Sequence, residues 1–141
     1  MREILFRGKQ INTGKWVEGY FVEQDNPRYY SYIIGSFIAE VDDRHTDVVH
    51  SSIYNVGPET VVQYTGLTDK NGMKIFEGDI VKTESELFCN CGIGTIEFLK
   101  DWCIWYISGD VQNGLGDIAN GGEIEVIGNI HDDPELLEVE E

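Results

Sequence analysis

The sequence predicts a mainly β protein built from short antiparallel strands. Three observations support this: the chain contains 16 glycines, apolar and polar residues alternate over short stretches, and few stretches have the apolar spacing of a helix. The hydrophobic share of 41%, with 7 Tyr, 6 Phe and 3 Trp, supplies enough apolar side chains for a core. A length of 141 residues is usual for one domain.

The first half of the chain contains three stretches with strand character. Residues 2–7 alternate charged and apolar side chains, as a half-buried strand does. Residues 15–23 are rich in aromatic and β-branched residues, which are enriched in strands. Residues 29–39 form a similar stretch, which Gly35 interrupts.

The second half has clearer strand signals. Residues 60–64 and 74–76 flank Asn71-Gly72, the dipeptide best suited to a two-residue type I′ turn, so a hairpin is expected here. Further strands are expected over residues 80–83, 94–100 and 123–130. In the last of these, alternation places Ile124, Val126 and Ile130 on one face.

These elements predict a single compact β-rich domain over residues 1–131, which can be divided into residues 1–65 and 66–131. The second part is expected to form a small, strongly bent barrel of the SH3-like kind, with a sandwich as the alternative. Residues 132–141 predict a short helix, with Pro134 at its first position, and an acidic tail.

Two glycine-containing stretches are candidates for ligand chemistry. Residues 114–119 fit the letters of a dinucleotide fingerprint, but a β pattern resumes too soon for the long helix that such a site needs, so an exposed, mobile loop is expected. Glu77 and Asp79 could form a carboxylate pair, yet hydrogen bonds from backbone amides to Asp79 are favoured.

The charge is strongly and unevenly acidic. Lys and Arg total 10 against 26 Asp and Glu, a net charge of −16, and the last ten residues hold 6 acidic side chains and no basic one. This balance argues against direct binding to nucleic acid, which needs a cationic face, and against docking on an anionic membrane.

The cysteines and the apolar runs indicate the compartment. The first residues contain no uninterrupted apolar stretch for a signal peptide, and the run over residues 102–107 is too short to cross a membrane. Three cysteines are an odd number for a disulfide framework, so a cytoplasmic location is expected. Cys89, Cys91 and Cys103 could supply thiolates to zinc, but without a clear fourth ligand reduced thiols are favoured.

The segment from Asp42 to His50 contains two histidines and three carboxylates within nine residues. Such a group could bind a divalent metal or supply an acid and a base. On a strand, however, His45 and His50 would lie on opposite faces, so a polar loop leading into a strand is favoured.

Trp102, Trp105 and Tyr106 form the most prominent apolar cluster. Alternation sends Trp102 and Tyr106 to one face of a strand and Trp105 to the other. A strand that is apolar on both faces is buried in the core or lies at an interface, where aromatic residues are enriched. Core is the default, and an interface for self-association is the competing interpretation.

Three blocks of the sequence resemble the YopX family, which is found in phages and prophages. They lie within residues 2–20, 59–81 and 125–137, and include Gln63-Tyr64-Thr65-Gly66-Leu67 and Ile75-Phe76-Glu77-Gly78-Asp79. The resemblance implies a phage-encoded cytoplasmic protein, mainly β, from a family without an established activity. It supplies no catalytic, cofactor or metal-binding residues.

The leading hypothesis is a non-enzymatic protein-binding or self-assembling module without a cofactor, acting on a host or phage protein as a homo-oligomer. One alternative is an acidic mimic of nucleic acid that blocks a basic host protein. A second alternative is a metal-dependent enzyme that uses His45 and His50.

Overall fold

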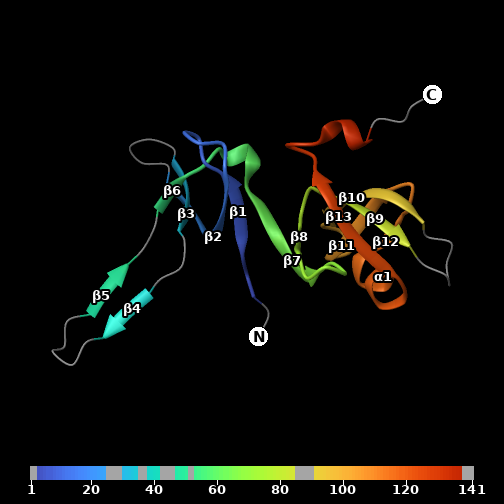
Figure 1. Cartoon of the computed structure of the whole chain (residues 1–141), viewed down its shortest axis with the longest axis horizontal. Helices are drawn as coiled ribbons and strands as arrows, with labels where there is room; N and C mark the ends of the chain where they lie inside the picture. The colour runs from blue at the N-terminus through green and yellow to red at the C-terminus, as the bar shows by residue number, and fades with distance from the viewer. Residues whose placement is uncertain are drawn as a thin grey trace. The chain divides into compact units, whose positions relative to one another are not determined.

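A computed structural model of the chain describes residues 3–24, 30–34, 38–41, 47–50, 53–84 and 91–137, and Figure 1 gives the order of the elements. The chain divides into two compact units, Met1–Gln63 and Tyr64–Glu141. Strand β7 (Val62–Thr68) begins in the N-terminal unit and continues in the C-terminal unit. The prediction of a mainly β fold with antiparallel strands is confirmed.

The N-terminal unit is an antiparallel sheet in which β6, β3, β2 and β1 are neighbours in that order. Strand β1 also pairs with the start of β7. The bounds are β1 (Phe6–Lys9), β2 (Trp16–Gln24), β3 (Tyr30–Ile34) and β6 (Ile53–Asn55). A separate hairpin joins β4 (Ile38–Val41) to β5 (Asp47–His50), and the 3-10 helix η1 (Pro58–Thr60) precedes β7. The stretch predicted over residues 29–39 is thus two strands, β3 and β4.

Close contacts around β1 hold this unit together. The rings of Phe6 and Phe21 lie 5.8 Å apart between centroids. Val56 is fully buried, and a Cβ at Gly8 would lie 3.1 Å from the Cβ of Val56, so a side chain at position 8 would crowd this contact. The Lys9 amide donates to Thr60 Oγ1 at 2.9 Å, which ties η1 to β1.

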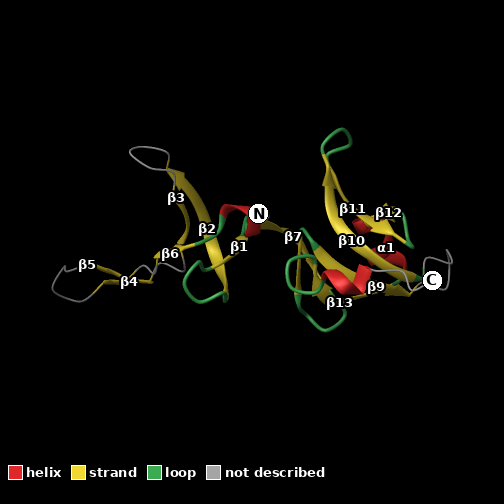
Figure 2. Ribbon diagram, turned by 90° about the horizontal axis from the view of Figure 1, so that it is seen from above, coloured by secondary structure: helices red, strands yellow, loops and turns green. Residues whose placement is uncertain are grey.

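The C-terminal unit contains a five-stranded antiparallel sheet in the order β12-β11-β10-β9-β13, together with the pairing of β7 and β8. Figure 2 shows α1 next to β11 and β12. The bounds are β8 (Lys74–Phe76), β9 (Asp79–Glu84), β10 (Gly92–Leu99), β11 (Ile104–Gly109), β12 (Asn113–Gly114), α1 (Leu115–Gly121), β13 (Glu123–Asn129) and the 3-10 helix η2 (Pro134–Leu137). The core consists of Ile75, Val81, Ile96, Ile107, Val111, Leu115, Ile118 and Ile124.

The sheet of the C-terminal unit is open, with β12 and β13 at its edges, and does not close into the expected barrel. Strand β12 pairs with only Tyr106 and Ile107 of β11 before the chain turns into α1. A strand this short cannot pair along β13, and closure needs every strand to pair on both sides. Helix α1 buries Leu115 and Ile118 against the core instead.

The prediction of an exposed loop over residues 114–119 is wrong, because β12 ends at Gly114 and α1 begins at Leu115. Leu115 and Ile118 lie one helical turn apart and are 0% and 3% exposed. Burial of these two side chains stabilises a helix that its glycines disfavour, since tertiary packing supplies most helical stability in proteins.

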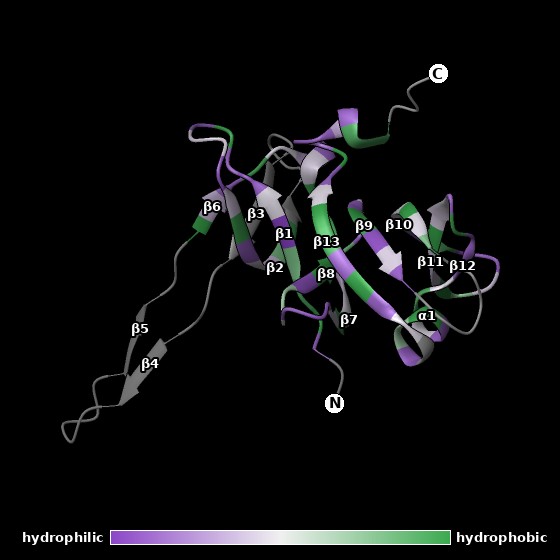
Figure 3. Ribbon diagram, turned by 45° about the vertical axis from the view of Figure 1, so that its right-hand side comes forward, coloured by the Kyte–Doolittle hydropathy of each residue, from purple (hydrophilic) through white to green (hydrophobic). Residues whose placement is uncertain are grey.

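Strand β13 confirms the predicted alternation only in its first half. Ile124 is buried and Val126 packs against the core, and Figure 3 shows hydrophobic and hydrophilic residues alternating along the strand. A bulge then breaks the register with β9, since Val126 pairs with Val81 and Gly128 pairs with Ile80. The extra residue shifts the alternation, so the prediction for Ile130 is wrong, and its side chain is 39% exposed.

The hairpin predicted around Asn71-Gly72 is confirmed, but its turn is not a two-residue turn. Thr68 pairs with Lys74, so residues 69–73 form the loop. Among the described residues Cys103 is the only non-glycine residue with positive φ, so Asn71 lacks the conformation that a type I′ turn requires. Gly72, with a φ of 81°, takes the left-handed position, and its amide donates to the Asp69 carbonyl at 3.0 Å.

The predicted short C-terminal helix is the 3-10 helix η2, which begins at Pro134. It packs on β13 at Gly128, where a Cβ would lie 2.6 Å from Asp133 Oδ2 and 2.9 Å from Leu136 Cδ1. Among the described residues, the helices are too short to cross a bilayer.

Candidate functional site

The tip of the β10–β11 hairpin exposes a tryptophan. Leu99 pairs with Ile104, so residues 100–103 form the turn, in which the Trp102 amide donates to the Leu99 carbonyl at 3.3 Å. Cys103 has a φ of 54°, a conformation that L residues adopt rarely. The Trp102 side chain is 77% exposed, because it lies in the turn rather than in the strand that the sequence predicted.

Trp105 and Tyr106 occupy different environments from Trp102. Trp105 packs against the core and meets Phe98 edge to face, with 5.1 Å between ring centroids. Tyr106 is half-buried and pairs with Glu97 on one side and Gly114 on the other. Of the three predicted interface side chains, Trp102 is therefore exposed, Tyr106 is half-buried, and only Trp105 packs against the core.

A shallow groove of about 300 Å³ opens beside this hairpin. It is lined by Leu67, Ile104, Trp105, Gly114, Leu115, Gly116 and Asp117. The groove forms because β12 covers only Tyr106 and Ile107 of β11, so the end of β11 at Ile104 and Trp105 extends past the edge strand. Figures 1 and 2 show β11, β12 and α1 close together.

Large apolar side chains are exposed around the groove. We call this the apolar surface, defined as Leu67, Phe98, Ile104 and Trp105 together with Trp102 on the hairpin tip. Leu67 is 36%, Ile104 39% and Phe98 41% exposed. Adjacent exposed apolar side chains are typical of interaction sites, whereas single ones need no explanation.

Charged residues lie on both parts of this region. The hairpin turn contains Lys100 and Asp101 directly before Trp102, and Asp117 lines the groove in the first turn of α1. Neither Lys100 nor Asp117 forms an ion pair within the described part of the chain.

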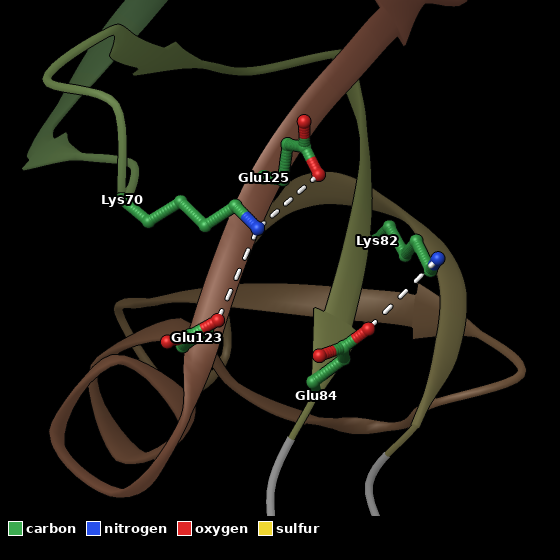
Figure 4. A pocket seen from close by; sticks show the side chains of 5 residues that line it. All are labelled: Lys70, Lys82, Glu84, Glu123 and Glu125. Carbon is green, nitrogen blue, oxygen red and sulfur yellow. Dashed lines mark ion pairs between the residues drawn. The ribbon is translucent and has the colours of Figure 1, made fainter.

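A second charged region combines two lysines with three glutamates. Lys70 Nζ lies 3.6 Å from Glu125 Oε2 and 3.9 Å from Glu123 Oε2. Lys82 Nζ lies 3.9 Å from Glu84 Oε1. Figure 4 shows Lys70 reaching between the two glutamates of β13. These side chains are largely exposed, so each pair contributes little to stability.

Asp69 connects the β7–β8 loop to β13. Its Oδ1 accepts hydrogen bonds from the Asn71 and Met73 amides, both at 2.9 Å, and its Oδ2 accepts one from the Val126 amide at 3.0 Å. Burial opposes ionisation of this carboxyl, but the amides and Lys70 outweigh that effect and lower the pKa of Asp69 below its usual value. Its acceptor atoms are therefore engaged in holding the fold.

Asp79 has a similar structural role. Its side chain is 1% exposed, and Oδ2 accepts a hydrogen bond from the Phe76 amide at 2.8 Å. The prediction that Asp79 binds backbone amides in the turn is confirmed. Its neighbour Gly78 has a φ of 82°, which directs the turn between β8 and β9.

The predicted metal-ligand candidates are only partly covered by the described residues. Cys89, Asp42, Asp43 and His45 lie outside them, and Asp47 and His50 are the first and last residues of β5. The side chains of Cys91 and Cys103 are exposed. Within the described ranges, no three His, Cys, Asp or Glu side chains are grouped closely enough to hold a metal ion.

The sequence predicted Trp105 as an interface candidate but not the other residues that line the groove. Leu115 lies in a stretch that the sequence predicts to be a loop. The spacing of Leu115 and Ile118, three residues apart, was the available signal for α1. Nothing in the sequence places Leu67 of β7 next to α1, because this proximity depends on tertiary structure.

Comparison with known proteins identifies a family and a similar solved structure. The family model described as "YopX protein" matches residues 5–138. The crystal structure of protein EF1440 from Enterococcus faecalis is similar, with a TM-score of 0.61 and 25% sequence identity, over 98% of this chain and 100% of that chain. No curated protein matches the chain.

Proposed function

The chain belongs to the YopX protein family, and on this premise we propose that it is a phage or prophage accessory protein acting in the host cytoplasm as a non-enzymatic protein-binding module. The observation that carries the proposal is the 77% exposure of Trp102 on a hairpin tip beside an apolar groove. Exposing an indole to water is unfavourable, and binding a partner would remove it from water.

The composition of the apolar surface fits protein recognition. Tryptophan is among the side chains that contribute most binding energy at protein interfaces, and such anchors fill pockets on the partner. Phe98 and Trp105 pack edge to face, which fixes their orientation before any partner arrives. A surface with ordered side chains loses less conformational entropy on binding.

The chemistry of the described carboxylates supports the non-enzymatic part of the proposal. Asp69 and Asp79 are the most buried of them, and both accept hydrogen bonds from backbone amides. A general acid or base needs a polar atom that can reach a substrate. These two carboxylates instead stabilise turns.

The nucleic-acid mimic receives less support from the described residues. A mimic needs carboxylates in a regular array that resembles phosphates. Glu84, Glu123 and Glu125 are the best grouped, yet Lys70 and Lys82 lie among them. Because of these lysines, the face that carries the three glutamates is not uniformly negative.

The metal-dependent enzyme remains a prediction for the segment from Asp42 to His50. Elemental analysis of protein purified without added metal tests it directly. A stoichiometric ion that His45→Ala or His50→Ala removes would establish a metal site there.

Affinity capture tests the protein-binding proposal. Wild type, Trp102→Ala and the control Met73→Ala would each be used as bait in lysate from cells in which the phage is active. Met73 suits as control because its side chain is apolar, 54% exposed and outside the apolar surface. We expect Trp102→Ala to lose proteins that wild type and Met73→Ala retain. Identical captured proteins for all three baits would contradict the proposed site.

A further inference from the structure

We infer that the apolar surface binds a second copy of this chain, with Trp102 of each copy seated in the groove of the other. This inference rests on the proposed function and specifies its partner. It follows from three properties of the C-terminal unit: the arrangement of tip and groove, the size of the groove, and the charges beside each part.

The protruding tryptophan and two of the residues that line the groove, Ile104 and Trp105, belong to the same hairpin. Trp102 is in the turn, and Ile104, two residues later, already lines the groove. A two-fold axis through such a region brings the tip of each copy to the groove of the other, because an isologous interface uses the same patch on both subunits. A different partner would require only one of the two parts.

The groove can accept an aromatic side chain. Its volume is about 300 Å³, and an apolar cavity of about 150 Å³ is enough to bind benzene. The exposed apolar surface of Leu67 and Ile104 in its lining suits an indole. The space over α1 is open, since a Cβ at Gly116 would meet no atom within 4 Å.

One pair of charges beside the two parts is complementary. The turn contains both Lys100 and Asp101, so it has no net charge, and Asp117 lines the groove. In the reciprocal arrangement, Lys100 of each copy approaches Asp117 of the other. This pairing is favourable for a chain whose net charge of −16 otherwise makes two copies repel.

Analytical ultracentrifugation of the full chain tests the role of Trp102. Wild type and Met73→Ala are expected to form a dimer at submillimolar concentration. Trp102→Ala should bind itself at least about tenfold more weakly, because loss of a central Trp commonly costs that much. Its side chain is 77% exposed, so the variant should keep the fold. A monomeric wild type, or a dimer that Trp102→Ala leaves unchanged, would overturn the inference.

A charge exchange tests the orientation of the two copies. Lys100→Glu and Asp117→Lys should each weaken the dimer by about three- to tenfold, as expected for exposed ion pairs made twice. The double variant should regain most of the affinity, because the pair is restored with its charges reversed. Absence of this recovery would refute the reciprocal seating of Trp102 beside Asp117.

The failure of this inference can be distinguished from failure of the proposed function. A wild type that sediments as a monomer, while Trp102→Ala still loses captured proteins, would refute self-association and leave a different protein as the partner. If Trp102→Ala changes neither the sedimentation nor the captured proteins, the apolar surface is not a binding site.

Discussion

Asp69 shows how one buried carboxylate can join distant parts of the chain. It accepts amide hydrogen bonds from its own loop and from Val126, which is 57 residues away in sequence. The Lys70 amide also donates to the Ile124 carbonyl at 2.9 Å, so two adjacent residues hold the β7–β8 loop on β13. Loss of the carboxylate should therefore loosen this attachment.

Asp69→Asn is expected to destabilise the protein by about 1–3 kcal/mol, the usual cost of an unsatisfied buried amide. In one orientation, the new NH₂ group faces the Val126 amide, and in the other it faces the Asn71 and Met73 amides. Urea denaturation followed by tryptophan fluorescence measures the change. The control is Asp101→Asn in the exposed hairpin turn, and equal stability of the two variants would disprove this role.

The low pKa of Asp69 predicts how the difference depends on pH. A carboxyl whose pKa is lowered by folding stabilises the fold fully above its unfolded pKa of about 3.9, and this contribution is lost as pH falls through the folded pKa. The stability gap between wild type and Asp69→Asn should be constant above about pH 5 and shrink below about pH 4. A gap that widens in acid would contradict the direction of the shift.

Residue-scale chemistry was predictable from the sequence where the partners are local. Asp79 and its turn were predicted, because the bond to the Phe76 amide spans three residues. The role of Asp69 was missed, since the Val126 amide belongs to a strand far along the chain. The exposure of Trp102 was missed because β11 begins at Ile104, two residues after Trp102, whereas the sequence predicted a strand that included Trp102.

At the scale of elements, α1 and β13 show how packing modifies sequence patterns. Most of the strands followed from alternation and turn residues. Helix α1 was missed because its glycines and short length conceal a two-residue apolar face. The bulge in β13 was missed because the extra residue has no distinctive residue type or spacing in the sequence.

Two glycine substitutions test these elements in opposite directions. Gly128→Ala should destabilise the protein by about 1–3 kcal/mol, because overpacking forces neighbours to move, and the new Cβ would meet Asp133 and Leu136 of the adjoining η2 region. Gly116→Ala has open space in α1 and should stabilise it by about 0.5–1 kcal/mol. Thermal denaturation of both variants gives the signs, and a stable Gly128→Ala would contradict the packing of η2 on β13.

At the scale of the whole molecule, charge and apolar contact act against each other. The net charge of −16 makes two copies repel, whereas the proposed contact between two apolar surfaces favours their association. Composition alone predicted the acidity but gave no position for a partner. The groove depends on β7, β11 and α1, which only the fold brings together.

Salt should therefore strengthen self-association. Raising ionic strength from 0.01 M to 0.1 M shortens the Debye length from about 30 Å to about 10 Å, which screens repulsion between copies. The dimer dissociation constant, measured by sedimentation at both ionic strengths, should fall. A rise in the dissociation constant would show that attraction between opposite charges across the interface outweighs the repulsion between the two copies.

The protein has two thiols that report directly on the central claim that the hairpin tip is a contact surface. Cys103 follows Trp102 in the turn, Cys91 comes just before β10, and both side chains are exposed. Alkylation followed by mass spectrometry gives the rate at each thiol as protein concentration increases. The rate at Cys103 should fall while that at Cys91 stays constant, and equal rates at Cys103 at every concentration would contradict the account.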